Sequence, residues 1–330
     1  MKPLPRFWTD ATGEVHSPDG KEFFLTLHGW STSSLAEAAQ VARRRLEEAA
    51  AAVRAGRELA RGGYYPRVPL REEILTEVTG SDGELIAAIT RNRYGAEVLN
   101  TDAVLIADVD LPSGRGIREH RRPRRDRTPR QGGRPAEPKR GFFARLFGRR
   151  STSDLIATPA PHQHGTPSRT APHTAPAGAT GAGAAAVATI EAVAARHPQW
   201  GFRTYRTAAG LRVIVTGSRL QPGSPEAEQL LRELDSDPLY VTLCATHETY
   251  RARLTPKPWR VGHRALTVTY PYERFGHIVN PWLQKYASAS EGYATCALVS
   301  TGGPAPDAVE QQVIDLHDER AQSGSGLPLA

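Results

Sequence analysis

Two carboxylates placed one residue apart are the clearest candidates for chemistry in this sequence. They are Asp108 and Asp110, and they end an apolar stretch that begins at Val104. In a β-strand, side chains two positions apart share a face, so the carboxylates would point the same way, about 7 Å apart. Like charges this close favour a bound cation, and carboxylate oxygens suit Mg²⁺ or Mn²⁺. The alternative is a pair of aspartates that only mark the exit of a strand into a loop.

The length and composition of the chain suit a globular protein. Its 330 residues suffice for two domains and a sizeable core. The sequence has no apolar run of about 20 residues that would predict a transmembrane helix, and its first residues do not resemble a signal peptide. Cys244 and Cys296 are its only cysteines, which argues against a disulfide framework or a cysteine zinc site. We therefore expect a cytoplasmic protein.

Positive charge is concentrated in one segment. Residues 113–150 contain 14 Lys and Arg against three acids, so the rest of the chain carries a net −4 although the whole chain carries +7. Residues 113–183 are rich in Arg, Pro, Gly and Ala and poor in large apolar residues, which predicts a disordered insert. Within it, residues 139–150 would form a narrow apolar helical stripe among cations, made of Phe142, Phe143, Leu146 and Phe147. This stripe could contact an anionic membrane, nucleic acid or a protein groove, or have no partner.

The segments before the acid pair predict an N-terminal α/β module over residues 1–80. Residues 1–30 have the pattern of a β-hairpin that turns at Pro18-Asp19-Gly20. A long helix follows, capped by Ser33 or Ser34 and extending to about Arg61, and then a short helix over 70–79. A meander is expected next, with strands that start at Leu85, return over 96–99 and end over 104–110.

Without the insert, residues 81–112 and 184–262 predict the element order βαββαβ. After the acid-bearing strand, the expected elements are a helix over 185–197, strands over 200–207 and 211–216, a helix over 225–234 and a strand over 250–254. This order is that of an RRM-like, or ferredoxin-like, α+β core, with its first and third strands side by side and both helices on one face. A C-terminal α/β extension over 263–330 would add strands at 265–270 and 293–300 and helices at 281–288 and 306–320.

Strand alternation assigns charged side chains to the open face of this sheet. Asp108 and Asp110 would share that face with Arg212 of the third strand and with Arg251 and Arg253 of the last strand. Carboxylates that bind a metal, flanked by guanidinium groups that bind phosphate oxygens, suit a metal–triphosphate. The alternative is a row of cross-strand salt bridges on a wetted sheet face.

The strand that ends in Asp108-Val109-Asp110, followed by a hairpin with Gly210-Leu211-Arg212, resembles the archaeo-eukaryotic primase superfamily over residues 84–112 and 185–262. The resemblance implies an RRM-like palm whose Asp-x-Asp binds the catalytic metals. The chain departs from the family pattern at two points. Arg212 stands where the family has a histidine, and no clear third acid is present, because Asp237 and Glu248 only flank the apolar stretch 239–243.

The expected function is a primase/polymerase-like nucleotidyltransferase, or its inactive descendant, that acts on nucleic acid and nucleoside triphosphates. Mg²⁺ or Mn²⁺ would bind the acid pair, and Arg212 with Arg251 or Arg253 would bind phosphates. Arg91 and Arg93 would contact nucleic acid from the turn before the acid strand, unless that turn is an ordinary polar one. The alternatives are a non-catalytic nucleic-acid-binding protein and an adaptor that acts through the basic insert. Two further expectations are that His317-Asp318 is a surface pair and that Trp259 lies in the core.

Overall fold

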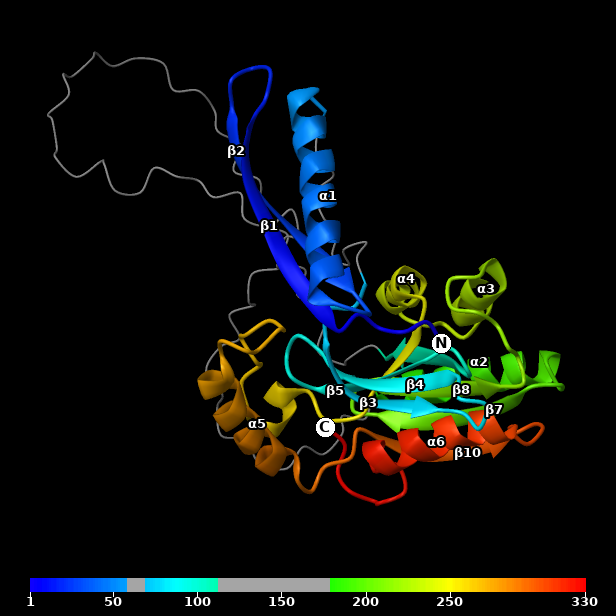
Figure 1. Ribbon diagram of the computed structural model, residues 1–330. Helices are drawn as coiled ribbons and strands as arrows, with labels where there is room; N and C mark the ends of the chain where they lie inside the picture. Colours follow the sequence, from blue (N-terminus) through cyan, green and yellow to red (C-terminus); the bar gives the residue numbers. More distant parts are fainter. Residues whose placement is uncertain (58–68, 112–178) are drawn as a thin grey trace, which may run out of the picture.

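The chain folds as a mixed α+β protein with two four-stranded antiparallel sheets and a separate two-stranded sheet (Figure 1). The computed structural model describes residues 1–57, 69–111 and 179–330. Within these ranges, no helix has both the length and the apolar character needed to cross a membrane. The predicted basic insert and its stripe at 139–150 lie outside the described residues, except for 179–183. These five residues belong to helix α2 (Ala179–Arg196), so the predicted disorder does not extend to residue 183.

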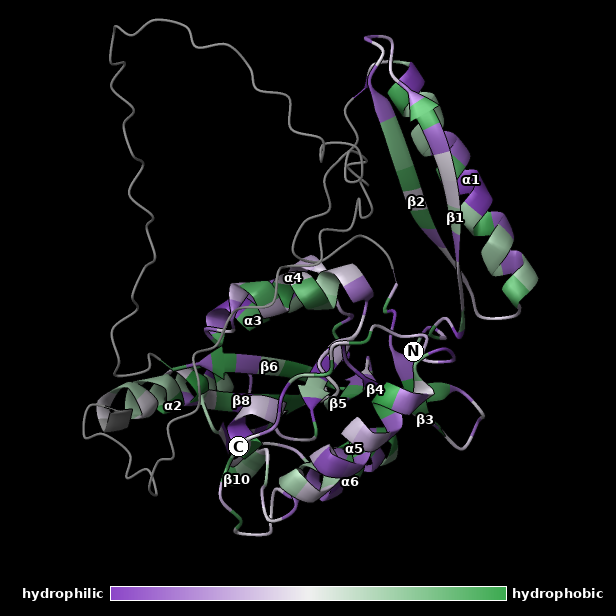
Figure 2. Ribbon diagram, turned by 90° about the vertical axis from the view of Figure 1, so that its left-hand side faces the viewer, coloured by the Kyte–Doolittle hydropathy of each residue, from purple (hydrophilic) through white to green (hydrophobic). Residues whose placement is uncertain are grey.

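The N-terminal module is a β-ribbon with one helix packed on it. Strands β1 (Phe7–His16) and β2 (Glu22–Ser31) pair as the sequence predicts, and α1 (Leu35–Arg54) follows. Ser34 caps α1 by accepting a hydrogen bond from the Glu37 amide, and the helix ends before the predicted Arg61. Gly29 permits the close packing, because a Cβ there would lie 2.0 Å from a carbonyl oxygen of α1. The module projects from the rest of the molecule in Figures 1 and 2.

One four-stranded sheet has the order β3-β4-β5-β9. Its strands are β3 (Glu73–Thr79), β4 (Leu85–Arg91), β5 (Glu97–Thr101) and β9 (Tyr250–Arg253). The short helix predicted over 70–79 is wrong, because this segment contains strand β3. Its β-branched residues Ile74, Thr76, Val78 and Thr79 favour extended backbone, and its pairing with β4 satisfies the main chain.

The second sheet has the order β10-β7-β8-β6 and contains the acid pair. Its strands are β6 (Leu105–Asp110), β7 (Gly201–Thr207), β8 (Gly210–Thr216) and β10 (Cys296–Gly302). Strands β6 and β8 are neighbours, as predicted, and their register sets Asp108 opposite Arg212. The predicted meander is therefore only partly correct, since β4 pairs with β5 but β6 belongs to the other sheet.

The fourth strand of the predicted core departs from the expected order. Strand β9 forms its backbone ladder with β5 and none with β6. The Tyr240 side chain of α4 (Pro238–His247) occupies the place of that ladder. Its hydroxyl lies 2.9 Å from the Ile106 carbonyl oxygen and 3.0 Å from that of Arg251, and it accepts a hydrogen bond from the Arg251 amide. One side chain thus satisfies backbone groups that two paired strands would otherwise satisfy for each other.

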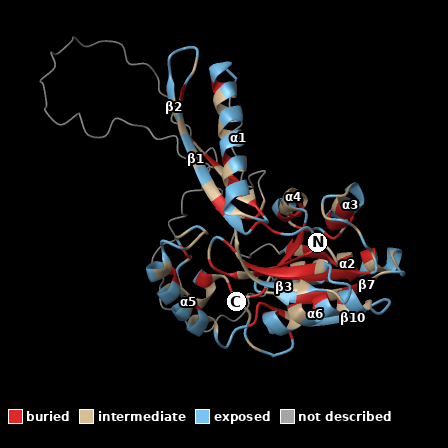
Figure 3. Ribbon diagram, viewed as in Figure 1, coloured by how far each residue is buried: buried red, intermediate tan, exposed pale blue. Residues whose placement is uncertain are grey.

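Helices cover both faces of the sheet that contains β6. Figures 1 and 2 place α3 (Pro225–Glu233) and α4 on one side and α6 (Ala308–Ala321) on the other. The face predicted to be open is therefore largely covered by α6. Figure 3 shows the strands mostly buried between these helices, and their apolar side chains form one continuous core. The acid pair lies at the end of β6, where this cover stops and the side chains become partly exposed.

The C-terminal extension differs from the prediction in three places. Residues 265–270 form no strand, and they are held instead by a hydrogen bond from the Leu266 amide to the Tyr94 carbonyl oxygen. Helix α5 (Gly276–Ser290) begins earlier than predicted and contains Pro281, and β10 begins three residues late. Helix α6 agrees with the prediction to within two residues and is capped by Asp307.

Replacing Tyr240 by phenylalanine should lower the free energy of unfolding by about 1–3 kcal/mol, because it leaves buried backbone groups of β6 and β9 without a partner. Urea denaturation followed by circular dichroism measures the change. Tyr270→Phe is the matched control, since this hydroxyl donates one exposed hydrogen bond to the Arg6 carbonyl oxygen and its loss should cost at most about 0.5 kcal/mol. Equal free energies of unfolding for the two variants would contradict the bridging role of Tyr240.

Candidate metal and anion site

The acid pair lies where a charged face of the sheet reaches solvent. Asp108 is about half-buried and Asp110 is exposed. Partial burial raises the pKa of Asp110, and the neighbouring charges of Asp108 and Asp237 raise it further. Asp237 comes close because the start of α4 caps the edge of β6, where its amide donates to the Asp108 carbonyl oxygen at 2.9 Å. Like charges gathered in this way favour a cation, as the spacing of the pair predicts.

Arg212 is buried behind the acid pair rather than exposed beside it. Only 2% of the residue is exposed. Its Nη1 donates to the Arg253 carbonyl oxygen at 3.1 Å and lies 3.1 Å from His317 Nε2, while Nη2 lies 3.8 Å from Asp108 Oδ1. Since a guanidinium only donates, His317 Nε2 must accept, and its Nδ1 then donates to Asp318 at 2.8 Å. Arg212 therefore orients Asp108 and is not positioned to bind a phosphate.

The expectation that His317-Asp318 is a surface pair is wrong. His317 is fully buried, its pKa is lowered by that burial, and its ring meets the Tyr205 ring at 4.9 Å. Asp318 also accepts a hydrogen bond from Arg203 at 3.1 Å. A signal for this burial is present in the sequence, because Val313 lies four residues before His317 on the same face of α6, and both are buried.

Three cations from one short stretch lie near the acid pair. They are Arg253 at the end of β9, Lys257 in the following loop and Arg260 in a 3₁₀ turn (Pro258–Val261). Burial and the charges of the two arginines lower the pKa of Lys257 to about 8, and the charges of the two aspartates oppose this shift. None of the three forms an ion pair with a carboxylate in the described ranges. Arg253 Nε and Arg260 Nη1 are buried without an acceptor, so donors exceed acceptors here.

The loop that contains Lys257 is fixed from both sides. Tyr286 of α5 lies with its hydroxyl 2.5 Å from the Pro256 carbonyl oxygen and 2.9 Å from Thr255 Oγ1. Thr255 Oγ1 in turn accepts a hydrogen bond from the Glu97 amide of β5 at 2.8 Å. The prolines on each side of Lys257 restrict φ, which limits the conformations of the loop. The backbone that carries Lys257 is thus held in place before any ligand binds.

The structure does not bring all of the predicted site residues together. Asp108, Asp110, Arg212 and Arg253 are neighbours, but Arg251 points away and forms a buried ion pair with Glu72 at 2.7 Å. Arg91 is also engaged, donating to Glu73 at 2.8 Å and to the Gly95 carbonyl oxygen at 3.2 Å. Arg93 lies exposed in the turn at residues 92–95. Arg251 and Arg91 therefore hold strands and loops in place.

Sequence reasoning missed Lys257, Arg260 and His317. A pattern that could have pointed to the first two is Pro256-Lys257-Pro258-Trp259-Arg260, in which cations alternate with residues that stiffen the chain directly after a basic strand. Lys257 and Arg260 lie near the acid pair because of the way β9 lies beside β6, and no local sequence pattern predicts that arrangement.

The acid pair fits a divalent metal that is coordinated partly by the protein and partly by a substrate. No cluster of three or more His, Cys, Asp or Glu that could hold a metal occurs in the ranges 1–57, 69–111 and 179–330. Asp237 is near, but its Oδ1 accepts the Leu239 amide as the cap of α4. Mg²⁺ commonly takes one or two carboxylates and completes its shell with phosphate oxygens and water. Asp108 and Asp110 suffice for that arrangement.

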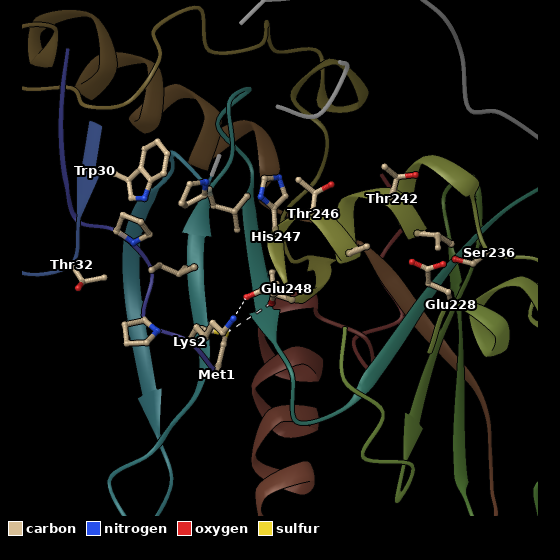
Figure 4. Close-up of a pocket in the computed structure, with 18 of the residues that line it drawn as sticks. Met1, Lys2, Trp30, Thr32, Glu228, Ser236, Thr242, Thr246, His247 and Glu248 are labelled. Carbon is tan, nitrogen blue, oxygen red and sulfur yellow. Dashed lines mark hydrogen bonds and ion pairs between the residues drawn. The ribbon is translucent and has the colours of Figure 1, made fainter. Parts of the chain in front are cut away.

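A separate pocket of about 970 Å³ lies between the N-terminal residues and α4 (Figure 4). Its wall includes the ion pair of Lys2 and Glu248, which Figure 4 shows bridging the two sides, and His247, whose pKa burial lowers to about 4. Neither aspartate of the acid pair lines this pocket, and none of the three cations does. The candidate metal and anion site is therefore distinct from it.

Comparisons with protein-family models, curated proteins and solved structures find no match for this chain. Function is therefore inferred from the chemistry of the residues. Two carboxylates of one strand face a cationic loop with unsatisfied donors, which is an arrangement that can take up a metal and a multiply charged anion together.

The binding of Mg²⁺-tripolyphosphate should weaken by roughly tenfold between pH about 7 and about 9.5, because Lys257 loses its charge as the pH rises through its pKa of about 8. Isothermal titration calorimetry at several pH values measures this profile. Lys257→Arg is the matched control, since its guanidinium stays charged over the whole range and its profile should be flatter. Parallel profiles for the two proteins would show that Lys257 does not contact the anion.

Proposed function

We propose that Asp108 and Asp110 bind a divalent metal–nucleoside triphosphate together with the cations that follow β9, and that the protein is a primase/polymerase-like nucleotidyltransferase. The observation that carries the proposal is the meeting of Asp110 with Arg253, Lys257 and Arg260, which have no ion-pair partner in the described ranges, beside Asp108, whose one ion pair is with the buried Arg212. A structural salt-bridge network would pair Asp110 with one of the three cations. Charges of both signs left without a partner suit a ligand that itself carries both.

The geometry suggests a role for each side chain. The aspartates would supply carboxylate oxygens to Mg²⁺ or Mn²⁺, and a bound metal would neutralise charge during in-line attack of a 3′-hydroxyl on the α-phosphorus. Arg253 and Arg260 offer planar donors to phosphate oxygens, and Lys257 offers a compact charge near both. Arg212 keeps Asp108 in position from within the sheet.

The resemblance to the archaeo-eukaryotic primases supports the proposal in two respects. The Asp-x-Asp ends β6, and β6 is paired with β8, as the first and third strands of an RRM-like palm are. The ladder of β9 with β5 and the contact of Arg212 with His317 depart from the arrangement that the resemblance implies. We therefore propose an RRM-like palm in which β9 is joined to β6 by side chains.

A second candidate is a non-catalytic nucleic-acid-binding protein. It is favoured by the lack, among the described residues, of a cluster of three or more groups that could hold a metal and by the buried position of Arg212, where the family has its nucleotide-contacting histidine. Such a protein would bind nucleic acid with strong salt dependence and without a divalent metal. The adaptor hypothesis stays a prediction, because residues 139–150 lie outside the described ranges.

Replacing both aspartates, as Asp108→Asn/Asp110→Asn, should weaken the binding of ATP and dATP in Mn²⁺ by at least about tenfold, because the metal loses both protein ligands. Isothermal titration calorimetry of the full chain measures the affinity. The matched control is Glu47→Gln/Glu48→Gln, which makes the same change of charge on the exposed side of α1. Circular dichroism of each variant verifies that it is folded.

The outcomes separate the two candidate functions. Micromolar, metal-dependent binding that only the aspartate variant loses supports the metal–nucleotide site, and primer extension with Mn²⁺ then tests transfer itself. Nucleotide binding without extension identifies an inactive descendant. If the folded wild-type protein binds no nucleotide, the proposed activity is excluded and the non-catalytic candidate is favoured.

A further inference from the structure

The folded part of the chain contains a basic segment of its own. Residues 253–285 include six Lys and Arg and a single acid, Glu273, for a net charge of +5. Outside this segment and the insert at 113–150, the rest of the chain carries a net −9. Charge of one sign on the loop after β9 and on α5, in an otherwise acidic fold, favours an anionic partner at this place.

The same segment exposes an aromatic side chain that the sequence suggested would be buried. Trp259 is 45% exposed. Its ring meets the Tyr94 ring nearly edge-on, with centroids 5.3 Å apart, and Lys257 Nζ lies 5.8 Å from its centre. An indole that keeps this exposure beside a second ring and a cation offers aromatic surface on which a nucleic-acid base can stack.

Apolar exposure continues from this ring pair along α5. Trp282 packs directly against Gly95, where a Cβ would come within 2.1 Å of its ring, so the helix abuts the turn that contains Tyr94. One helical turn before Trp282, Ile278 is 44% exposed, and Phe275 at the start of the helix is 42% exposed. Figure 3 shows most of α5 exposed to solvent.

We propose that this face, the strand-binding surface formed by Tyr94, Trp259, Phe275 and Ile278, binds single-stranded nucleic acid. Bases stack on or pack against the exposed side chains, and the exposed cations of the segment, Arg264, Arg274 and Lys285, contact the phosphates. A duplex offers only its phosphates here, because its bases are already stacked within the helix, so single strands are preferred. Binding does not depend on the metal–nucleotide site, although Arg260 links the two sites by lying near both Tyr94 and Asp110.

Fluorescence anisotropy with a labelled DNA of about 20 nucleotides, single-stranded or duplex, tests the surface on the full chain without divalent metal. Trp259→Ala should weaken single-strand binding by about tenfold and leave duplex binding unchanged, because only stacking is lost. Phe275→Ala/Ile278→Ala should act in the same direction by a smaller factor. The matched control is Phe24→Ala, an aromatic residue of similar exposure on the N-terminal ribbon, which should bind as the wild type does.

Wild-type affinity for the single strand in both surface variants, with all proteins folded by circular dichroism, would overturn the proposal. Equal affinity for single strand and duplex, insensitive to Trp259→Ala, would also overturn it and assign binding to the basic insert. The Asp108→Asn/Asp110→Asn variant should keep single-strand binding, since neither carboxylate belongs to the surface. If the wild-type protein binds the single strand but no nucleotide, only the proposed function is rejected. If it binds nucleotide but the single strand does not depend on this surface, only the strand-binding surface is rejected.

Discussion

Side chains join β6 to β9 where a backbone ladder would otherwise do so, and the candidate site depends on this substitution. Tyr240 satisfies the backbone at Ile106 and Arg251, and Arg212 donates to the Arg253 carbonyl oxygen. A continuous ladder would fix both strands at one spacing along their length. With side chains between them, the end of β9 is free to form its ladder with β5 while its last residue and the following loop remain near the acid pair.

The buried guanidinium of Arg212 makes this arrangement rigid and also costly to disturb. A charge with 2% exposure needs acceptors and a counter-charge, and here Nη1 has acceptors on β9 and α6 and Nη2 lies near Asp108 of β6, while Nε is buried without a partner. The contact between Arg212 and His317 requires a neutral imidazole, because a protonated ring would place a second cation against the guanidinium. Asp318 holds the required tautomer by accepting the Nδ1 proton. The acid strand is thus tied to the C-terminal helix through one chain of polar contacts.

Charge at the site also matches the proposed ligand. Asp108, Asp110 and the nearby Asp237 contribute three negative charges, and Arg212, Arg253, Lys257 and Arg260 contribute four positive ones, so the site carries a net of about +1 near pH 7, where Lys257 is still mostly protonated. A divalent metal bound to a fully ionised triphosphate carries about −2. A lone divalent cation would increase the imbalance and a lone phosphate would leave the aspartates facing an anion, whereas the complex of the two compensates both.

Local patterns in the sequence account for much of the fold and for less of the site. Alternation and turn residues identify the hairpin β1–β2 and strands β4 to β8, and a capping serine locates the start of α1. The acid pair was found because two side chains on one strand share a face regardless of tertiary structure. The roles of Lys257 and His317 could not be found in this way, since their positions depend on packing between segments that are distant in sequence. The partition into two sheets was missed for the same reason, because it depends on which distant strands pair with each other.

Helix α5 shows how the two proposed sites share one support. Its Tyr286 holds the loop that contains Lys257, and its Trp282 packs against Gly95, whose φ of +98° suits glycine alone. The stacked Trp282 and Tyr286 rings, 4.8 Å apart, connect these two contacts within one turn of helix. A nucleic-acid strand on the strand-binding surface and a nucleotide at the loop would therefore both be positioned by α5. Because both sites are fixed by the same helix, the end of a bound strand would reach the acid pair without a conformational change.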